Sequence, residues 1–383
     1  MAKRILMYFR GNGLGHLRRS RNIALAILKR SPESSILVLA DEIATPFFAP
    51  VRGLDHIKLP VLLPARGAPY STSLLNCDFD RVMDLRRNLI LEVVKGFNPD
   101  VVLVDHGPVG VEGDLKPLLD RVASSPTRPK LYLGIRDILA SPEQTDQDWT
   151  RLGVYDYLEY YDAVLVYGSS EFFDTAATYG LSSRVRRLIY CSYVAPPREE
   201  LARNQDSDGP IILAMGGAGH DATAMELALV RALPLVQETI PYPAVVLTGP
   251  FMAPKDRQAI HREAQGCEFP PQVLNRSEDA TQLIRRAELI VTLAGYNSMV
   301  EILQWQKKAL VVPRMLGRSE QPLRTRLFAE RGLVHWLSLE EATPDTMAQA
   351  LLRLYHADNI PNPDNLPPFD GAQRAAAVIL GEE

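Results

Sequence analysis

The chain has 383 residues, of which 46% are hydrophobic and 23% charged, with a formal net charge of -4 at pH 7. This length suits two domains, and the composition is ordinary for a soluble globular protein. The negative net charge argues against a general nucleic-acid-binding protein, which normally has a positive net charge. Three widely spaced cysteines without a C-x-x-C pair argue against a zinc or dithiol site and favour a cytoplasmic location. The chain lacks an apolar run of about eighteen residues, so we expect no transmembrane helix.

Short apolar runs alternate with amphipathic stretches through the first half of the chain. Runs that are apolar throughout indicate strands buried on both faces, as in a parallel sheet covered by helices. The predicted strands are Ile5–Phe9, Ser35–Ala40, Val101–Asp105, Lys130–Gly134 and Ala163–Tyr167. The predicted helices are Leu14–Lys29, Arg81–Lys95 and Trp149–Tyr160. This half therefore predicts a first α/β domain over residues 1–195.

The alternation pauses at Pro196 and Pro197 and at the polar run that follows them, which predicts a linker over residues 196–209. A second α/β domain is expected over residues 210–360. Its predicted strands are Ile211–Met215, Ala244–Thr248, Leu289–Leu293 and Ala309–Pro313. Its predicted helices are Asp221–Gln237, Glu278–Arg286, Ser298–Gln304 and Gln321–Glu330. The tail over residues 361–383 is expected to carry a helix at Gly371–Leu380 that packs back on the first domain.

A glycine-rich turn joins the first predicted strand to the first predicted helix. Gly11, Gly13 and Gly15 let the backbone approach a ligand, but their spacing is not the dinucleotide fingerprint. His16 follows at the helix start, where the positive end of the helix dipole disfavours the imidazolium, so we expect a neutral imidazole near pH 7. A neutral imidazole can act as a general base. The alternative is a tight turn whose histidine caps or packs.

A second glycine-rich turn follows the first strand of the second domain. The N–H groups of Gly216, Gly217 and Gly219 can form a nest for phosphate oxygens in front of a helix. The alternative is a strained turn at the domain entrance.

A third turn, at Ala294 and Gly295, leads into Asn297, Ser298 and Glu301. A carboxylate one turn into a helix can hold both hydroxyls of a ribose. The alternative is purely structural, because Ser298 and Glu301 have the spacing of a capping box.

A fourth segment follows the predicted strand that ends at Pro313. Loops beyond the carboxyl ends of parallel strands bind ligands in α/β sheets, so Glu320 and Gln321 are candidate contacts to sugar hydroxyls. As single residues they also fit a solvated loop.

Polar residues also follow two strands of the first domain. Asp105 and His106 are a candidate acid/base pair, although Asp105 also fits a cap, and Arg136 is a candidate anion contact. Arg18 belongs to a small basic cluster in the first helix.

Together, these four turns in this order resemble the GT-B glycosyltransferases, and family 28 in particular. The resemblance is strongest from Gln272 to Gly332. It implies an α/β fold with two Rossmann-like, doubly wound domains that face a central cleft.

The resemblance also implies a role for each candidate residue. His16 faces the donor and either activates the acceptor, alone or with Asp105 or His106, or contacts the sugar. Arg18 and Arg136 lie on the acceptor side. The implied donor contacts are Gly13, Gly15, Gly216, Gly217, Gly219, Val273, Ala294, Gly295, Asn297, Ser298, Glu301, Glu320 and Gln321. Among these, the glycines of the second domain hold the diphosphate, the backbone at Val273 reads the base, and Glu301 holds the ribose.

The expected reaction is an inverting sugar transfer from a nucleotide-diphosphate sugar, with a UDP-sugar favoured, to an unidentified hydroxyl of a small or lipid-linked acceptor. We expect no metal or other cofactor, because helix N-termini can stabilise the leaving diphosphate and no D-x-D motif directly follows a predicted strand. Peripheral contact with a membrane stays open.

Two alternatives to a glycosyltransferase remain. One is a nucleotide-sugar hydrolase, since such enzymes share the turn from Gly13 to Arg19. The other is a non-catalytic nucleotide-sugar-binding subunit.

Overall fold

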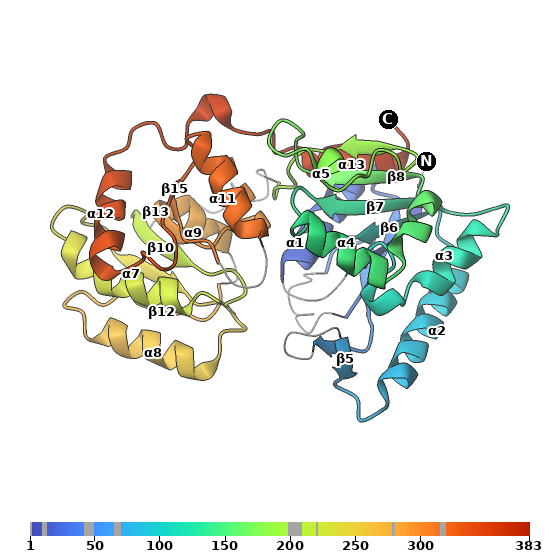
Figure 1. Ribbon diagram of the computed structural model, residues 1–383, viewed down its shortest axis with the longest axis horizontal. Helices are drawn as coiled ribbons and strands as arrows, with labels where there is room; N and C mark the ends of the chain where they lie inside the picture. The colour runs from blue at the N-terminus through green and yellow to red at the C-terminus, as the bar shows by residue number, and fades with distance from the viewer. Residues whose placement is uncertain are drawn as a thin grey trace. The chain divides into compact units, whose positions relative to one another are not determined.

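The computed structural model describes residues 2–9, 14–41, 50–64, 70–197, 209–219, 221–277, 280–314 and 319–383. The chain divides into two compact units (Figure 1). Unit 1 comprises Met1–Val194 and Pro368–Glu383, and unit 2 comprises Ala195–Pro367. Each unit contains one parallel sheet with helices packed on it.

Unit 1 is built on a seven-stranded parallel sheet in the order β3-β2-β1-β6-β7-β8-β9. The strands are β1 (Arg4–Phe9), β2 (Ser35–Ala40), β3 (Leu54–Lys58), β6 (Val101–Asp105), β7 (Lys130–Arg136), β8 (Ala163–Tyr167) and β9 (Leu188–Tyr190). All residues of β6 and β8 are buried, which explains why these strands are apolar except for Asp105 at the end of β6. The winding direction changes between β1 and β6, so these neighbours form the switch point of the sheet, and Phe9 pairs with Asp105 there.

The helices of unit 1 connect these strands and cover the sheet. They are α1 (Leu14–Arg30), α2 (Phe79–Phe97), α3 (Lys116–Ala123), α4 (Pro142–Arg151), α5 (Thr175–Thr178) and α13 (Gly371–Leu380). A hairpin of β4 (Leu62–Pro64) and β5 (Tyr70–Ser73) precedes α2. The last helix, α13, packs against α1 and lies among the elements of unit 1 in Figure 1. The Nζ atom of Lys3 donates to the carbonyl of Ile379 at 3.1 Å, which fixes the end of this helix beside β1.

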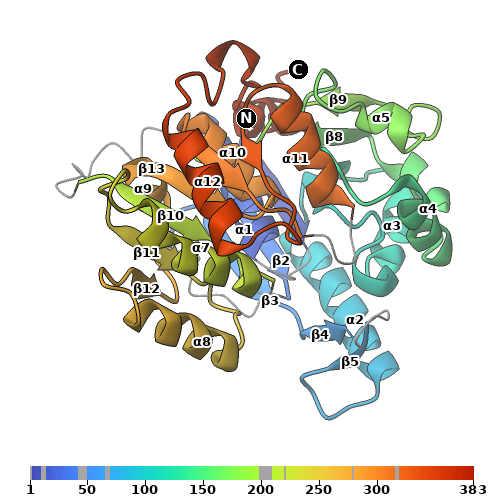
Figure 2. The same cartoon turned by 60° about the vertical axis from the view of Figure 1, so that its left-hand side comes forward.

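Unit 2 is built on a six-stranded parallel sheet in the order β12-β11-β10-β13-β14-β15. The strands are β10 (Ile211–Met215), β11 (Ala244–Leu247), β12 (Gln272–Leu274), β13 (Ala287–Thr292), β14 (Lys308–Val311) and β15 (His335–Trp336). The helices are α7 (Thr223–Val236), α8 (Pro254–Gln265), α9 (Ala280–Arg286), α10 (Tyr296–Gln304), α11 (Glu320–Glu330) and α12 (Pro344–Tyr355). Helices α7 and α12 lie side by side (Figure 2). The switch point of this sheet is between β10 and β13, where Met215 pairs with Thr292.

The predicted helix over Trp149–Tyr160 is wrong. Helix α4 begins at Pro142 because Ser141 caps it, its side chain accepting from the amide of Gln144 at 3.1 Å. It ends at Arg151, and Gly153 then takes the left-handed conformation (φ 61°) before two short 3₁₀ turns. The alternation of tyrosines and leucines after Trp149 reflects packing of these turns and not an α-helix.

None of the helices in the described ranges combines the length and apolar character that crossing a membrane requires.

Candidate functional site

The switch point of unit 1 brings the side chains of His16 and Asp105 together. His16 lies in the first turn of α1, and Asp105 is the last residue of the neighbouring strand β6. The Nδ1 atom of His16 lies 2.6 Å from Oδ2 of Asp105. The side chains are 13% and 3% exposed, so the pair is nearly enclosed by protein. Both residues were predicted as catalytic candidates, and the strand order is what makes them neighbours.

Arg19 completes this pair, although the sequence analysis assigned it no role. Its Nη2 atom donates to both oxygens of Asp105, at 2.8 and 2.7 Å, and its side chain is 1% exposed. Three positions separate it from His16, which places both side chains on one face of α1. The predicted neighbour Arg18 is partly buried on the same helix. The helical spacing from His16 is the signal that distinguishes Arg19 from Arg18.

Burial determines the protonation state of His16. It lowers the pKa of His16 to about 4, although the hydrogen bond and charge of Asp105 act in the opposite direction. Burial alone raises the pKa of Asp105, but the charge of Arg19 and the hydrogen bond of His16 outweigh it and lower that pKa. At neutral pH, the carboxylate is therefore an acceptor and Nδ1 of His16 donates to it. The Nε2 atom then bears the lone pair, as a general base requires.

His106 and Arg136 also belong to this neighbourhood. The ring centroids of His106 and His16 are 5.1 Å apart, and the rings are tilted by 41°. His106 has a φ of 73°, which is uncommon for a residue other than glycine, and its amide donates to the carbonyl of Gly134 at 2.7 Å. The charge of Arg136, the last residue of β7, contributes to the low pKa of His16. The structure thus places all three predicted strand-end residues near the imidazole.

A second buried charge network, missed by the sequence analysis, lies beside β1. Arg86 donates to Asp114 at 2.7 Å and to Asp41 at 3.2 Å, and the hydroxyl of Tyr8 donates to Asp114 at 2.8 Å. The Arg86 side chain is 1% exposed. The network ties α2 to the strand that precedes the His16 turn, so it supports the position of that turn from within the core.

In unit 2, the predicted phosphate loop lies at the switch point, directly after β10. The amide of Gly219 donates to the carbonyl of Gly216 at 3.2 Å, which closes a tight turn, and Gly217 and Gly219 have positive φ values of 64° and 98°. A Cβ atom on Gly216 would lie 2.0 Å from the Cβ of Ala222. The backbone therefore requires glycine here, whether or not a ligand binds.

The third predicted turn leads into α10 from the neighbouring strand, β13. Gly295 is the N-cap of this helix and no side chain caps it. Ser298 already lies inside the helix, so the capping-box interpretation of Ser298 and Glu301 is wrong. Glu301 is 1% exposed and accepts a hydrogen bond from the hydroxyl of Thr281 in α9. Its role as a ribose contact stays a prediction, as does that of Asn297 in the first turn.

Helix α11 contains the fourth predicted segment, and it also hydrogen-bonds to the third predicted turn. Glu320 and Gln321 are 6% and 7% exposed, so they are not solvated loop residues. The Oε1 atom of Gln321 accepts from the amide of Arg314 at 2.9 Å. Arg324, which the sequence analysis missed, is 1% exposed and donates to the carbonyl of Ala294 at 3.0 Å. Arg324 lies four residues after Glu320 on the same helix, so the two side chains share one face. This spacing is the sequence signal that indicates Arg324.

An ion pair joins two more of these loops. Nη1 of Arg314, after β14, lies 2.5 Å from Oδ2 of Asp221, two residues before α7 begins. The loops after β10, β13 and β14 are thus connected through side chains.

Val273 lies apart from them on the edge strand β12, where it pairs with Val246. Gly15 lies in the first turn of α1, whereas the predicted Gly13 lies outside the described residues.

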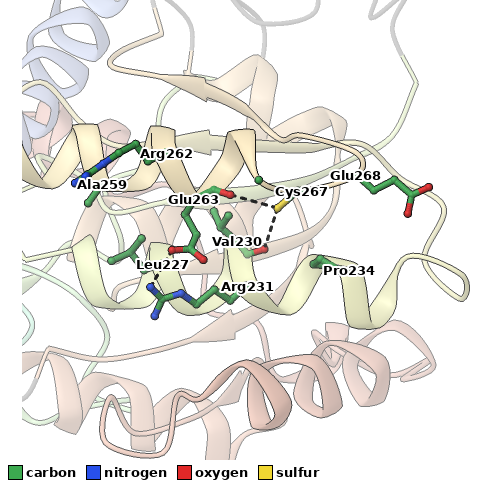
Figure 3. A pocket seen from close by; sticks show the side chains of 10 residues that line it. Leu227, Val230, Arg231, Pro234, Ala259, Arg262, Glu263, Cys267 and Glu268 are labelled. Carbon is green, nitrogen blue, oxygen red and sulfur yellow. Dashed lines mark hydrogen bonds and ion pairs between the residues drawn. The ribbon is translucent and has the colours of Figure 1, made fainter.

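A groove of about 720 Å³ lies between α7 and α8 (Figure 3). An ion pair of Arg231 and Glu263, 2.9 Å apart, spans it. Cys267 lies at its edge, and burial raises the pKa of this thiol. The lining contains none of the predicted site residues, so the groove is separate from the loops at the switch point.

The fold class follows from comparison with solved structures. The chain is similar to the glycotransferase of kitacinnamycin, with a TM-score of 0.67, 16% identity and coverage of 100% of this chain and 99% of that one. It is also similar to Acinetobacter baumannii MurG, with a TM-score of 0.58, 16% identity and coverage of 99% of both chains. The two parallel sheets with flanking helices are thus a GT-B architecture, and the predicted fold class is confirmed.

The sequence of the C-terminal part of the chain is similar to that of one enzyme family. Residues 211–373 match the glycosyltransferase family 28 C-terminal domain. The chain is also similar to enzymes named UDP-N-acetylglucosamine--N-acetylmuramyl-(pentapeptide) pyrophosphoryl-undecaprenol N-acetylglucosamine transferase. That of Geobacillus thermodenitrificans (strain NG80-2) is 26% identical over 39% of this chain and 40% of the relative. That of Anaeromyxobacter sp. (strain K) is 23% identical over 48% of this chain and 46% of the relative. The chain thus spans less than half the length of these relatives, and its C-terminal part is similar to that of the family 28 glycosyltransferases.

Proposed function

We propose that this protein is a metal-independent, inverting glycosyltransferase that transfers a sugar from a nucleotide-diphosphate sugar to an acceptor hydroxyl. The match of unit 2 to family 28 supports a nucleotide-sugar donor, and the names of the curated relatives favour a UDP-sugar. The observation that carries the transfer step is the contact of 2.6 Å between Nδ1 of His16 and Asp105, because it leaves Nε2 as a base.

In this proposal, the reaction is a single displacement. Nε2 of His16 takes the proton of the acceptor hydroxyl, and the oxygen attacks the anomeric carbon of the donor. The bond between that carbon and the diphosphate oxygen breaks, and the nucleoside diphosphate leaves with the electron pair. Asp105 stabilises the imidazolium that forms, as the carboxylate does in other acid–base pairs with histidine. The proton then passes to solvent, which restores the neutral imidazole.

On the donor side, we propose that fixed dipoles stabilise the leaving diphosphate, as a divalent metal ion does in other transferases. The glycine loop leads into α7, and Gly295 leads into α10 without a side-chain cap, so both helices present backbone N–H groups. These groups favour the negative charge that develops on the diphosphate as the bond breaks. Arg324 stabilises the second helix start through its hydrogen bond to Ala294.

The test has a binding step and a turnover step. Calorimetry with UDP-, GDP- and ADP-sugars, including UDP-N-acetylglucosamine, identifies the donor, and we expect a UDP-sugar to bind most tightly. Nucleotide release is then measured with and without added acceptors, in buffer and in EDTA. Release that requires an acceptor and persists in EDTA supports the proposal. Release without an acceptor supports the hydrolase, and binding without release under every acceptor supports the non-catalytic subunit.

A further inference from the structure

Glu226 is a fully buried carboxyl group beneath the glycine loop of unit 2. It lies in the first turn of α7 and is 0% exposed. Neither of its oxygens has a hydrogen-bond partner among the described residues. Its Oε1 atom lies 3.1 Å from the position that a Cβ atom on Gly216 would take, so the carboxyl group is directed at the first residue of the loop. Buried carboxylates are normally paired, and this one therefore requires an explanation.

Within the described part of the chain, no charged side chain compensates a negative charge on Glu226, since burial is the one cause of its pKa shift. Helix α7 packs against β10, α8 and α12, and β10 contains only apolar side chains. The ionisable residues of α8 and α12 are Lys255, Asp256, Arg257, His261, Arg262, Glu263, Asp345, Arg353 and Tyr355. Of these, Glu263 pairs with Arg231 on the outer side of α7, and Arg257 donates to the carbonyl of Met252. Burial is the cause that raises the pKa of Glu226 to about 8, so the group is neutral at pH 7.

We propose that Glu226 is a positioning residue for the donor, and that its carboxyl group must carry a proton for the glycine loop to hold the donor diphosphate. This inference rests on the proposed function, in which that loop binds the diphosphate. The positive end of α7 and the loop N–H groups attract a negative charge. An ionised Glu226 would itself interact with the positive end of α7. Its negative charge would also repel that of the diphosphate through a medium of low polarity. The protonated acid fills the same space without that repulsion.

The consequence is a donor affinity that depends on pH. Because the diphosphate disfavours ionisation of Glu226, binding of the donor and protonation of the carboxyl group favour each other. The affinity is constant near neutral pH and then falls as Glu226 ionises in the free protein. If only the protonated form binds, the dissociation constant rises about tenfold from pH 7 to about pH 9.

The experiment is calorimetry of UDP-N-acetylglucosamine on the full chain from about pH 6 to about pH 9, with wild type and Glu226→Gln. The amide has nearly the shape of the carboxylic acid and does not titrate. We expect the dissociation constant of the wild type to rise about tenfold and that of E226Q to change less than about twofold over this range. Any titration of the uracil ring affects both proteins equally. Glu263→Gln removes a neighbouring carboxylate on α8 and should follow the wild type.

Parallel pH profiles of E226Q and wild type would overturn the inference while leaving the donor assignment intact. A wild-type affinity that does not change with pH would overturn it as well, even if E226Q does not fold. Absence of binding by the wild type at every pH contradicts the proposed UDP-sugar donor, and the inference fails with it. Thermal unfolding of each variant at the same pH values shows that the compared proteins are folded.

Discussion

The switch points of the two sheets can be compared through one buried residue in each, His16 in α1 and Glu226 in α7. Both lie in the first turn of the helix that follows the first strand of their unit. Burial keeps both neutral at pH 7, because it lowers the pKa of His16 to about 4 and raises that of Glu226 to about 8. Their partners differ. His16 contacts the carboxylate of Asp105, whereas no described residue hydrogen-bonds with the carboxyl group of Glu226.

This difference shows that neighbours decide what a buried neutral group can do. The carboxylate beside His16 stabilises the positive charge that the imidazole acquires when it takes a proton, so unit 1 is suited to acid–base chemistry. The apolar surroundings of Glu226 disfavour its charge, so unit 2 keeps a negative charge away from the loop proposed to bind a diphosphate. Four predictions examine this contrast.

The largest effect is expected for His16→Ala. If His16 is the base, this variant lowers kcat/KM about 10²- to 10⁴-fold, the usual contribution of a general base. The dissociation constant of the nucleotide-sugar should change little, because most of the donor contacts are proposed for unit 2. Kinetics and calorimetry on the same preparation separate the two quantities. His56→Ala removes another histidine of the same sheet and serves as the control. Turnover of H16A at the wild-type rate would contradict the base assignment.

The next effect concerns the loss of stability as the pH rises and tests Glu226. An unfolded glutamate ionises near pH 4.5 and the folded one near pH 8. Folded protein therefore holds a proton that unfolded protein has released, and stability is lost as the pH rises between these values. Relative to E226Q, the wild-type free energy of unfolding should fall by about 5 kcal/mol over this window. Denaturant titrations at several pH values measure it. A constant difference between the two proteins would mean that Glu226 ionises normally.

His16 should give the opposite dependence at acidic pH. Its pKa is about 4 in the folded protein against 6.5 for the ordinary imidazole, so the unfolded chain takes up a proton first as the pH falls. The stability that neutral His16 provides is present above about pH 6.5 and is lost on acidification toward pH 4. Relative to His16→Asn, the wild type should lose about 3 kcal/mol across this window. Chemical denaturation at matched pH values provides the test, and equal acid sensitivity of both proteins would refute a buried neutral imidazole.

The smallest effect is expected for Arg324→Met. This change removes the hydrogen bond of 3.0 Å to the carbonyl of Ala294 but keeps an apolar side chain in the same space. Loss of a hydrogen bond from a charged donor costs about 1.5–3 kcal/mol, of which only a part acts on the ligand, so donor affinity should fall about fivefold. Arg231→Met removes an exposed ion pair on α7 and should leave the affinity unchanged. If the two variants behave alike, Arg324 has no part in shaping the turn before α10.

The amino-acid sequence determined the framework of both units because strand burial is a local pattern. The predicted strands Ser35–Ala40, Val101–Asp105, Ala163–Tyr167 and Ile211–Met215 have the observed bounds. Short edge strands such as β9 and β15 were missed, since two or three residues carry too little periodicity to be recognised. The glycine turns were also found from sequence, because a tight turn between a strand and a helix needs glycine where other backbone atoms approach closely, as at Gly216.

Only the tertiary structure decided which side chains meet. His16 and Asp105 are 89 positions apart, and they contact each other because β1 and β6 are neighbours in the sheet. In unit 1, burial of the pair lowers the pKa of His16, and in unit 2, the first turn of α7 is buried so that Glu226 has no hydrogen-bond partner among the described residues. Strand order results from contacts distant in sequence, whereas periodicity reports only local burial. The sequence could therefore name the imidazole as a neutral base, but it could not show that burial is the main cause.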